Sequence, residues 1–291
     1  MKKVFLIVLL ALFVAAPVFA LEDFQYDKSK VFIGVELAQE DKDIDDAILA
    51  DIQIGDFVGV GLTTTLKDFT VTTELLKVGY EINESVKPYL LVGAMQLEMK
   101  QQLNGSAQLG PFSGGTTLME TNMDGDANIA YGIGIGGDVA QYKGIVLSYD
   151  ARYLNASVDN QGNNLSILPE FTDIKLNNDV DVDYNELDLA LIASKTFDLT
   201  ETNEEGEKVK KLKIIESLTP SIGYRYSYTT VNVENKTKLG CISMESETNY
   251  RSHNHDLLLG LGAQVNENVS VKIAAIVGDN TGGMISAGYK F

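Results

Sequence analysis

Ile285-Ser286-Ala287-Gly288-Tyr289-Lys290-Phe291, the C-terminal segment of the chain, decides how the rest of the sequence is interpreted. Ile285, Ala287, Tyr289 and Phe291 alternate with small or polar residues. Side chains two positions apart lie on the same face of a β-strand. The segment therefore predicts a strand with one apolar face that ends on an aromatic residue.

The other end of the chain has the pattern of a secretory signal peptide. Lys2 and Lys3 precede an unbroken apolar run over 4–16, and Ala20 ends a plausible cleavage site. The run is too short to cross a bilayer comfortably as a permanent helix. We therefore expect residues 1–20 to be a cleaved signal peptide and 21–291 the mature domain. An uncleaved membrane anchor is the alternative.

Composition favours an all-β chain. Gly is abundant at 26 residues, Tyr and Phe number 13 and 11, and Pro only 5, which suits many strands joined by tight turns. Cys241 is the single cysteine, so no internal disulfide can form. The formal charge is −18, and removing Lys2 and Lys3 takes it to −20 (−18 − 2). This acidity disfavours nucleic acid as a partner.

Period-2 alternation recurs along the mature chain. The alternating segments are 31–37, 48–54, 58–62, 76–82, 89–99, 129–139, 145–153, 187–194, 222–228, 257–265, 269–277 and 285–291. Their less apolar face is dominated by Gly, Ser, Ala and isolated charges. That face suits the crowded interior of a closed barrel better than the water-exposed face of a sandwich.

The connections alternate between long and short. The segments 103–126, 159–179 and 235–248 are long, polar and rich in Gly or Asn, whereas the turns near 83–85, 142–143 and 266–268 are short. Outer-membrane barrels have long outer loops and short periplasmic turns. The charged segment 198–213 would fall on the short-turn side, and we interpret it as an extended hairpin.

The pattern over 21–291 resembles the superfamily of bacterial outer-membrane β-barrel proteins, with its porin-like and small opacity-type members. In that superfamily the last strand is read by the barrel-assembly machinery. The resemblance implies that Ile285, Ala287, Tyr289 and Phe291 form this assembly signal, with outer-membrane lipid, the assembly machinery and periplasmic chaperones as partners. It places the protein in the outer membrane of a Gram-negative-type cell envelope. It leaves the oligomeric state open.

We therefore expect one closed antiparallel transmembrane β-barrel with both termini in the periplasm. The best strand count is twelve, and ten is the alternative if the region 44–66 holds fewer crossings. Lipid offers no partner for an unpaired backbone group, so such a sheet must close on itself. The apolar faces place Tyr89, Tyr289 and Phe291 at one membrane interface, and Tyr153, Tyr226 and Tyr228 at the other.

The polar faces carry charges that we expect to point into the lumen. They are Glu36, Asp51, Lys77, Glu81, Glu98, Lys100, Asp138, Asp150, Arg152, Asp188, Arg225, Asp256, Lys272 and Lys290. If paired across strands, these charges would plug the barrel; if hydrated, they would line a pore with a modest cation preference. Glycines at 132, 134, 136, 260 and 262 leave space on the same face, which favours the pore.

The leading hypothesis is accordingly a porin-like barrel that lets small polar solutes cross passively. A non-conducting structural or surface-interaction (adhesin-like) barrel is the alternative. A hydrolase is the weaker alternative. The sequence gives no reason to expect an enzyme or a cofactor.

Two polar clusters are candidate sites. His253 and His255 share the face of the following leucines, so they are expected to point outward at the rim rather than to serve catalysis or bind a metal. Asp179, Asp181 and Asp183 are expected to form a solvated acidic rim, with calcium binding as the alternative. The alternation changes phase after these aspartates, which predicts a β-bulge or the point where the strand leaves the membrane.

Overall fold

The computed structural model describes residues 28–54, 58–109, 112–167, 174–202, 208–210, 215–239 and 242–291. The predicted signal peptide and Cys241 lie outside these ranges, so cleavage after Ala20 stays a prediction. Within the described ranges, no helix has the length and apolar character needed to cross a membrane.

Almost every described residue belongs to a strand. The elements are η1 (Lys28–Lys30), β1 (Val31–Asp41), β2 (Ala47–Ile54), β3 (Val58–Tyr80), β4 (Lys87–Leu109), β5 (Phe112–Asp124), β6 (Asn128–Tyr142), β7 (Ile145–Ile167), β8 (Ile174–Lys195), β9 (Phe197–Asp198), β10 (Thr200–Thr202), β11 (Lys208–Lys210), β12 (Ser217–Leu239), β13 (Ile242–Gln264), β14 (Val269–Gly278) and β15 (Thr281–Lys290).

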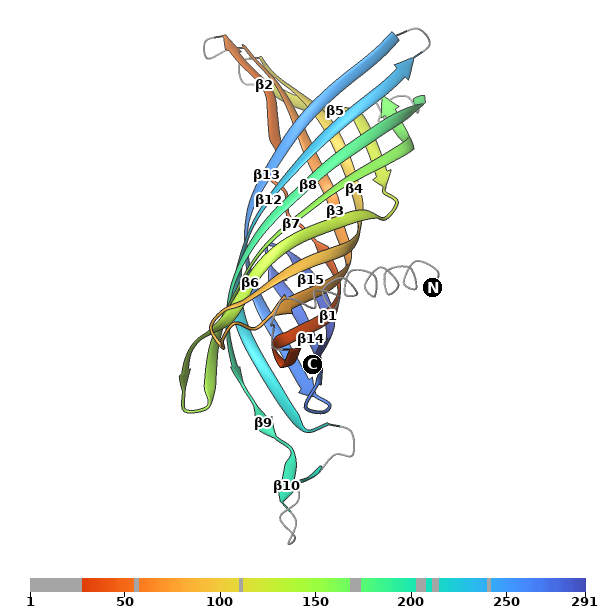
Figure 1. Cartoon of the computed structure of the whole chain (residues 1–291). Helices are drawn as coiled ribbons and strands as arrows, with labels where there is room; N and C mark the ends of the chain where they lie inside the picture. The colour runs from red at the N-terminus through yellow and green to blue at the C-terminus, as the bar shows by residue number, and fades with distance from the viewer. Residues whose placement is uncertain are drawn as a thin grey trace.

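Antiparallel pairing closes the main sheet into a barrel (Figure 1). Within the described ranges the circuit runs β1-β3-β4-β6-β7-β8-β12-β13-β14-β15 and returns to β1, where Ile33 pairs with Tyr289. β2 adds to β3, and β5 lies between β4 and β7. With β2 and β5 the ring-like sheet has twelve strands, so the predicted fold and count are confirmed. The alternative count of ten describes the closed circuit.

Two elements of that count differ from the predicted segments. The segments 58–62 and 76–82 belong to one strand, β3, which bends at a register shift between Lys67 and Thr70. Conversely, β5 lies inside 103–126, which was expected to be a loop. Polar side chains there pair across strands, since Gln102 Nε2 donates to Glu120 Oε2 at 2.9 Å.

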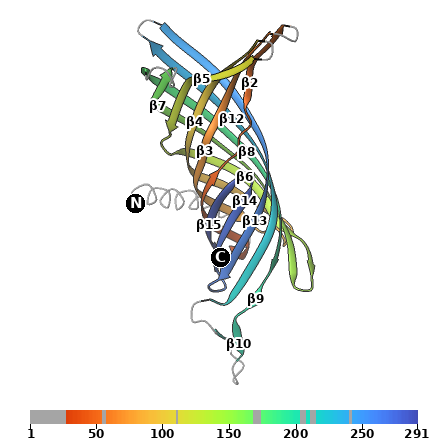
Figure 2. The same ribbon diagram turned by 180° about the vertical axis from the view of Figure 1, so that it is seen from behind.

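The two ends of the barrel differ (Figure 1 and, from behind, Figure 2). The C-terminus, β9 and β10 lie at one end, whereas β2, β5 and the β12–β13 hairpin lie at the other. We call the first the turn end, because the short turns near 83–86, 143–144 and 266–268 are there. β10 and β11 pair antiparallel, which matches the hairpin predicted in 198–213.

An apolar band surrounds the turn-end half of the outer surface. Exposed members of the band include Val35, Leu37, Leu90, Ile133, Ile135, Leu189, Leu191, Ile222, Leu257, Leu259, Leu261, Ile273 and Ile285. A membrane-spanning strand needs about 9–11 residues. β3, β4, β7, β12 and β13 have 23 residues each and β8 has 22, so they continue well past the band. We call these continuations, with β2 and β5, the extension.

The extension reverses the polarity of the membrane-spanning half. On β8, Val180, Val182 and Tyr184 are fully buried inside, while Asp179 and Asp183 are exposed outside. Water replaces lipid outside the extension, so polar residues take the outer face and apolar residues fill the interior. The change of phase after Tyr184 predicted either a β-bulge or the point where the strand leaves the membrane. β8 pairs with β12 without a register shift from Asn178 to Ser194, so the structure agrees with the second alternative.

Candidate functional site

The interior of the barrel is the candidate site, because charges from opposite walls meet in it. Arg152 on β7 reaches Glu36 on β1, with Nη1 to Oε1 at 2.7 Å. Its Nε donates to Asp188 Oδ2 on β8, also at 2.7 Å. Around the closed circuit, β7 lies four strands from β1 through β6 and six strands from β1 through β8, so the contact to Glu36 spans the interior.

A second arginine makes a stronger crossing. Arg225 on β12 donates to both carboxylate oxygens of Glu40 on β1, at 3.0 and 2.8 Å. Its Nε and Nη2 also bond Asp256 Oδ2 on β13, at 3.0 and 2.8 Å. Arg225 is only 4% exposed, and Asp256 only 1%. A two-pronged, buried contact of this kind fixes geometry as well as charge.

Lys42 extends these contacts toward the extension. Its Nζ lies 2.5 Å from Glu186 Oε1 and 3.2 Å from Glu40 Oε2. The Tyr184 hydroxyl donates to the other oxygen of Glu186 at 2.8 Å. We call Glu36, Glu40, Lys42, Arg152, Glu186, Asp188, Arg225 and Asp256 the lumen network. Its members are paired rather than hydrated as separate charges.

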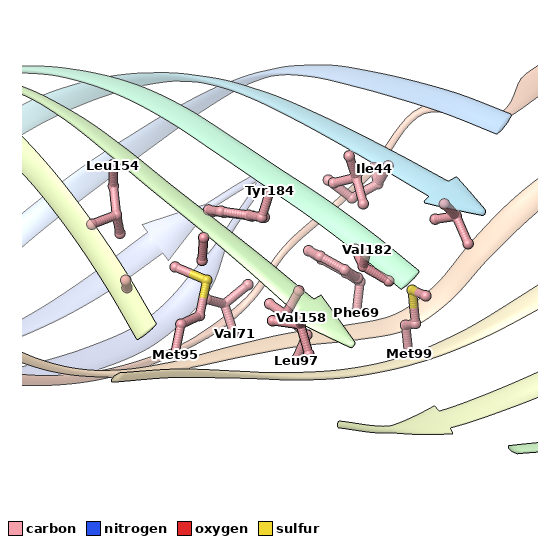
Figure 3. Close-up of a cluster of buried hydrophobic side chains, with 14 of the residues drawn as sticks. Ile44, Phe69, Val71, Met95, Leu97, Met99, Leu154, Val158, Val182 and Tyr184 are labelled. Carbon is pink, nitrogen blue, oxygen red and sulfur yellow. The ribbon is translucent and has the colours of Figure 1, made fainter. Parts of the chain in front are cut away.

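An apolar core fills the lumen above the network (Figure 3). It combines side chains from most walls of the extension. The core includes Ile44, Leu66, Phe69, Val71, Leu75, Met95, Leu97, Met99, Met123, Leu154, Val158, Val180, Val182, Tyr184, Val231, Val233 and Tyr250. The rings of Phe69 and Tyr184 stack at 6.3 Å between centroids, and Gln101 Nε2 donates to the Tyr250 hydroxyl at 2.8 Å.

Below the network, Tyr89 occupies space that glycines were expected to leave open. Its hydroxyl donates to Asp150 Oδ1 at 2.5 Å, and Lys77 Nζ lies 3.5 Å above its ring. A Cβ on Gly134 would lie 2.2 Å from the Tyr89 ring, so the absence of a side chain at Gly134 makes room for that ring. Tyr89 is 4% exposed and points inward, which corrects its predicted place at the membrane interface.

A cavity of about 100 Å³ remains between the lumen network and the turn end. Glu36, Glu40, Arg152, Asp188 and Arg225 line it on the network side. The rest of the lining is Asp150, Ala190, Ile192, Ser221, Leu258, Gly260, Lys272, Ala274, Ile276 and Met284.

Charged pairs also lie at the turn end. Lys290 Nζ is 2.6 Å from Glu81 Oε2, and Lys87 Nζ is 3.9 Å from both Glu81 and Asp138. The hydrogen bond from Lys290 lowers the pKa of Glu81, although partial desolvation opposes the shift. Ser148 donates to Asp138 at 2.8 Å.

Two of the predicted lumen charges lie on the outer face. Glu98 is exposed, and Lys100 pairs at 2.9 Å with Glu120 of β5, while Leu97 and Met99 point into the core. The four residues Tyr89–Val92 are all apolar, so they do not show which face of β4 points outward. The prediction for β4 therefore depended on Met95, Leu97 and Met99. Those residues face the core of the extension, not lipid. Asp51 lies on β2, and its side chain falls outside the described part of the structure.

Sequence reasoning missed three members of the lumen network. Glu40 and Lys42 lie at even positions, as Glu36 does, but the predicted alternating segment ends at residue 37. Glu186 shares the face of Asp188, but the expected bulge on β8 hid that relation. In both strands, extending the alternation without a phase change would have found these residues.

His253 and His255 face outward, as predicted. The Tyr226 hydroxyl is 2.7 Å from His253 Nδ1, and that of Tyr224 is 2.5 Å from His255 Nδ1. Tyr228 packs against His253 at 4.7 Å between ring centroids. These rings lie where the apolar band meets the extension, as interfacial aromatic residues do.

The predicted acidic rim faces outward on β8. Lys236 of β12 lies 2.9 Å from Asp181 Oδ2, so a basic side chain neutralises one of its carboxylates. In the part of the chain that the structure describes, no group of three or more His, Cys, Asp or Glu side chains is arranged to hold a metal.

The closed sheet and its outer apolar band define a transmembrane β-barrel. This is the closed antiparallel fold that the alternating segments of the sequence predict. No protein-family model and no curated protein matches the chain.

Solved structures match over most of their length at low identity. One is the outer membrane protease OmpT from Escherichia coli, at 7% identity over 93% of this chain and 99% of that chain, with a TM-score of 0.45. Another is the translocator domain of the autotransporter NalP from Neisseria meningitidis, at 10% identity over 97% and 96%, with a TM-score of 0.38. A third is the toluene transporter TbuX from Ralstonia pickettii, at 10% identity over 90% of each chain, with a TM-score of 0.33.

Proposed function

We propose that the protein is a closed, non-conducting outer-membrane barrel that presents its extension at the cell surface as an interaction platform. The observation that carries this proposal is the pairing of charges across the lumen. Arg152 and Arg225 both connect to β1 from the opposite wall, and an apolar core is stacked on these contacts. A hydrated path for polar solutes would have to break both layers.

The porin-like alternative depends on the lumen charges being hydrated. Arg225, Asp188 and Asp256 are each no more than 4% exposed, so water does not solvate them as separate ions. The inward glycines favoured a pore from the sequence, but the Tyr89 ring lies against Gly134 and Lys272 reaches past Gly260. The structure therefore gives more support to the surface-interaction barrel than to passive solute passage.

We place the extension outside the cell and both termini in the periplasm. The short turns at one end and the long strands at the other support this orientation, because outer-membrane barrels have short periplasmic turns. Outer-membrane lipid, the barrel-assembly machinery and periplasmic chaperones remain the proposed partners for insertion. The outward faces of the extension carry Asp179, Asp181, Asp183, Glu234, Glu245 and Glu247, so a basic surface would complement them.

We also propose that the protein is not an enzyme. Both histidines point away from the cavity, and a tyrosine hydroxyl occupies Nδ1 of each ring. A hydrolase would need a nucleophile or an activated water beside one of these imidazoles. Hydrolysis of lipid or peptide that is abolished by His255→Ala would contradict this assignment.

Planar-bilayer recording tests the closed lumen. Folded wild-type protein should give no discrete current steps, and reconstitution of a known open porin in the same lipid provides the positive control. Discrete, weakly cation-preferring steps from the wild type would restore the porin hypothesis.

The single cysteine tests the orientation. In the sequence, Cys241 lies between Leu239, the last residue of β12, and Ile242, the first residue of β13, and these two strand ends belong to the extension. A membrane-impermeant maleimide should label it in intact cells. The matched control is Cys241→Ser with Lys143→Cys at the opposite end, which should label only after the outer membrane is opened. The reverse labelling pattern would invert the proposed orientation.

A further inference from the structure

The cavity near the turn end combines three features that pairing within the barrel leaves unused. It has an unpaired cation, a buried carboxylate oxygen without a partner, and an apolar wall. Its volume of about 100 Å³ is of the same order as an engineered cavity of about 150 Å³ that binds benzene. The cavity therefore has room for a compact organic molecule but not for a long acyl chain.

Lys272 supplies the cation. It lines the cavity from β14 and forms no ion pair with any residue in the described ranges. Its neighbours across the two adjacent strands are Gly262 and Ser286, and a Cβ on Gly260 would lie 3.3 Å from its Cε. Small neighbours leave the ammonium group free to meet an anion from the cavity.

Asp188 supplies the acceptor. Its Oδ2 is held by Arg152 at 2.7 Å, and Arg225 Nη1 lies 4.0 Å from the same atom. Its Oδ1 is buried and has no hydrogen-bond partner among the residues that the structure describes. Asp188 is 4% exposed and lines the cavity. A buried polar oxygen of this kind is normally satisfied, so a donor from a bound molecule or an ordered water is needed there.

The remaining wall is apolar. Ile192, Leu258, Ile276 and Met284 line it together with Ala190 and Ala274. Carbon atoms of a ligand would replace water against these side chains, which favours binding. Polar groups at two points and a carbon body between them are the usual composition of a small-molecule site.

We propose that this cavity binds a small zwitterion of the α-amino acid class with a short apolar side chain. The carboxylate pairs with Lys272, the ammonium group donates to Asp188 Oδ1, and the side chain packs on Leu258 and Ile276. A simple carboxylate would leave Asp188 unsatisfied and would face its negative charge. A simple amine would leave Lys272 unpaired and would face its positive charge. Asp188 belongs both to this site and to the lumen network, so the proposal rests on the paired network of the proposed function.

The test uses the full mature chain folded in detergent, with radiolabelled L-alanine as the probe in equilibrium dialysis. The expected result is saturable binding to one site, with acetate and ethylammonium each binding at least tenfold more weakly. Lys272→Met should weaken L-alanine binding at least tenfold. Ala190→Leu should abolish binding by filling the cavity, although it removes no charge.

Lys195→Met is the matched control, since Lys195 is an exposed lysine at the turn end of β8 and does not line the cavity. It should bind L-alanine as the wild type does. Each variant is first checked for folding by the difference in gel migration between unboiled and boiled samples. Absence of saturable binding to folded wild-type protein would overturn the proposal, as would unchanged binding by folded Lys272→Met and Ala190→Leu. Equal binding of acetate would overturn the zwitterion assignment.

Discussion

Replacing Arg225 by methionine should destabilise the barrel substantially. The change removes four charge-assisted contacts and leaves two buried carboxylates, on Glu40 and Asp256, without their main partner. Breaking a buried pair by removing one partner costs about 3–5 kcal/mol. Part of this cost is offset here, because Glu40 keeps Lys42 at 3.2 Å and Asp256 keeps two bonds from Asn280 at 2.8 and 3.0 Å. We therefore expect a loss of about 3 kcal/mol, at the lower end of that range.

The assay is urea-induced unfolding of protein folded into lipid vesicles, followed by tyrosine fluorescence and by gel migration. Lys236→Met is the control, because Lys236 pairs with Asp181 on the exposed surface of the extension and should leave the free energy of unfolding unchanged. The double variant Arg225→Met with Glu40→Gln should lose less than the sum of the single changes, since the two residues contact each other. If Arg225→Met costs under about 1 kcal/mol, the lumen charges are hydrated and the reasoning for a closed barrel fails.

Three further changes test separate parts of the interior. Gly134→Ala should destabilise the barrel by about 1–3 kcal/mol, because its Cβ would lie 2.2 Å from the Tyr89 ring. Gly114→Ala is the control and should be tolerated, because no described atom lies within 4 Å of the new Cβ. Equal unfolding midpoints for the two variants would contradict the contact between Gly134 and Tyr89. Tyr184→Phe should lower the free energy of unfolding by about 1.5–3 kcal/mol, because it removes the hydroxyl that donates to Glu186 Oε2. If urea unfolding shows no difference from the wild type, water rather than Tyr184 satisfies that carboxylate. Lys290→Met should remove the hydrogen bond that lowers the pKa of Glu81 in the folded protein. Because the folded-state pKa is the lower one, this bond stabilises the fold at pH values above the unfolded-state pKa, and the stabilisation disappears as the pH falls through the folded-state pKa. The urea-unfolding curves of the wild type and the variant should therefore converge on acidification.

The membrane-spanning half could be predicted closely from the alternation alone. Val35 and Leu37 on β1, Ile133 and Ile135 on β6, and Ile285 on β15 face outward as expected. In this half the outside is lipid, so exposed positions are apolar, and on β1, β6 and β15, where apolar and small or polar residues alternate, the pattern has one interpretation. The closing pair of β1 with β15 follows from the same requirement, because no backbone group may be left unpaired in lipid.

The partners of the lumen charges could not be predicted, because alternation gives the face of a residue but not its depth. Arg152 and Glu36 lie on strands that are far apart in the sequence, and their contact depends on the tilt and stagger of the closed sheet. The same limit applies to Lys272, whose unpaired state depends on which charges reach it. The space beside Gly134 was also ambiguous, since a glycine can leave a void or admit a neighbouring ring.

The reversed polarity of the extension explains the remaining differences, and it has a signature in the sequence. On β8 the apolar residues change from even positions, at Val180 and Val182, to odd positions, at Leu187 and Leu189. A β-bulge would give the same change by shifting the register. The pairing register distinguishes the two cases. β8 pairs with β12 without a shift from Asn178 to Ser194, so Asp181 and Asp183 lie on the same face as the leucines and one unbroken strand passes from water into lipid. On β8 the parity change therefore marks the membrane boundary, which lies beside Glu186, at the level where the lumen network crosses the barrel.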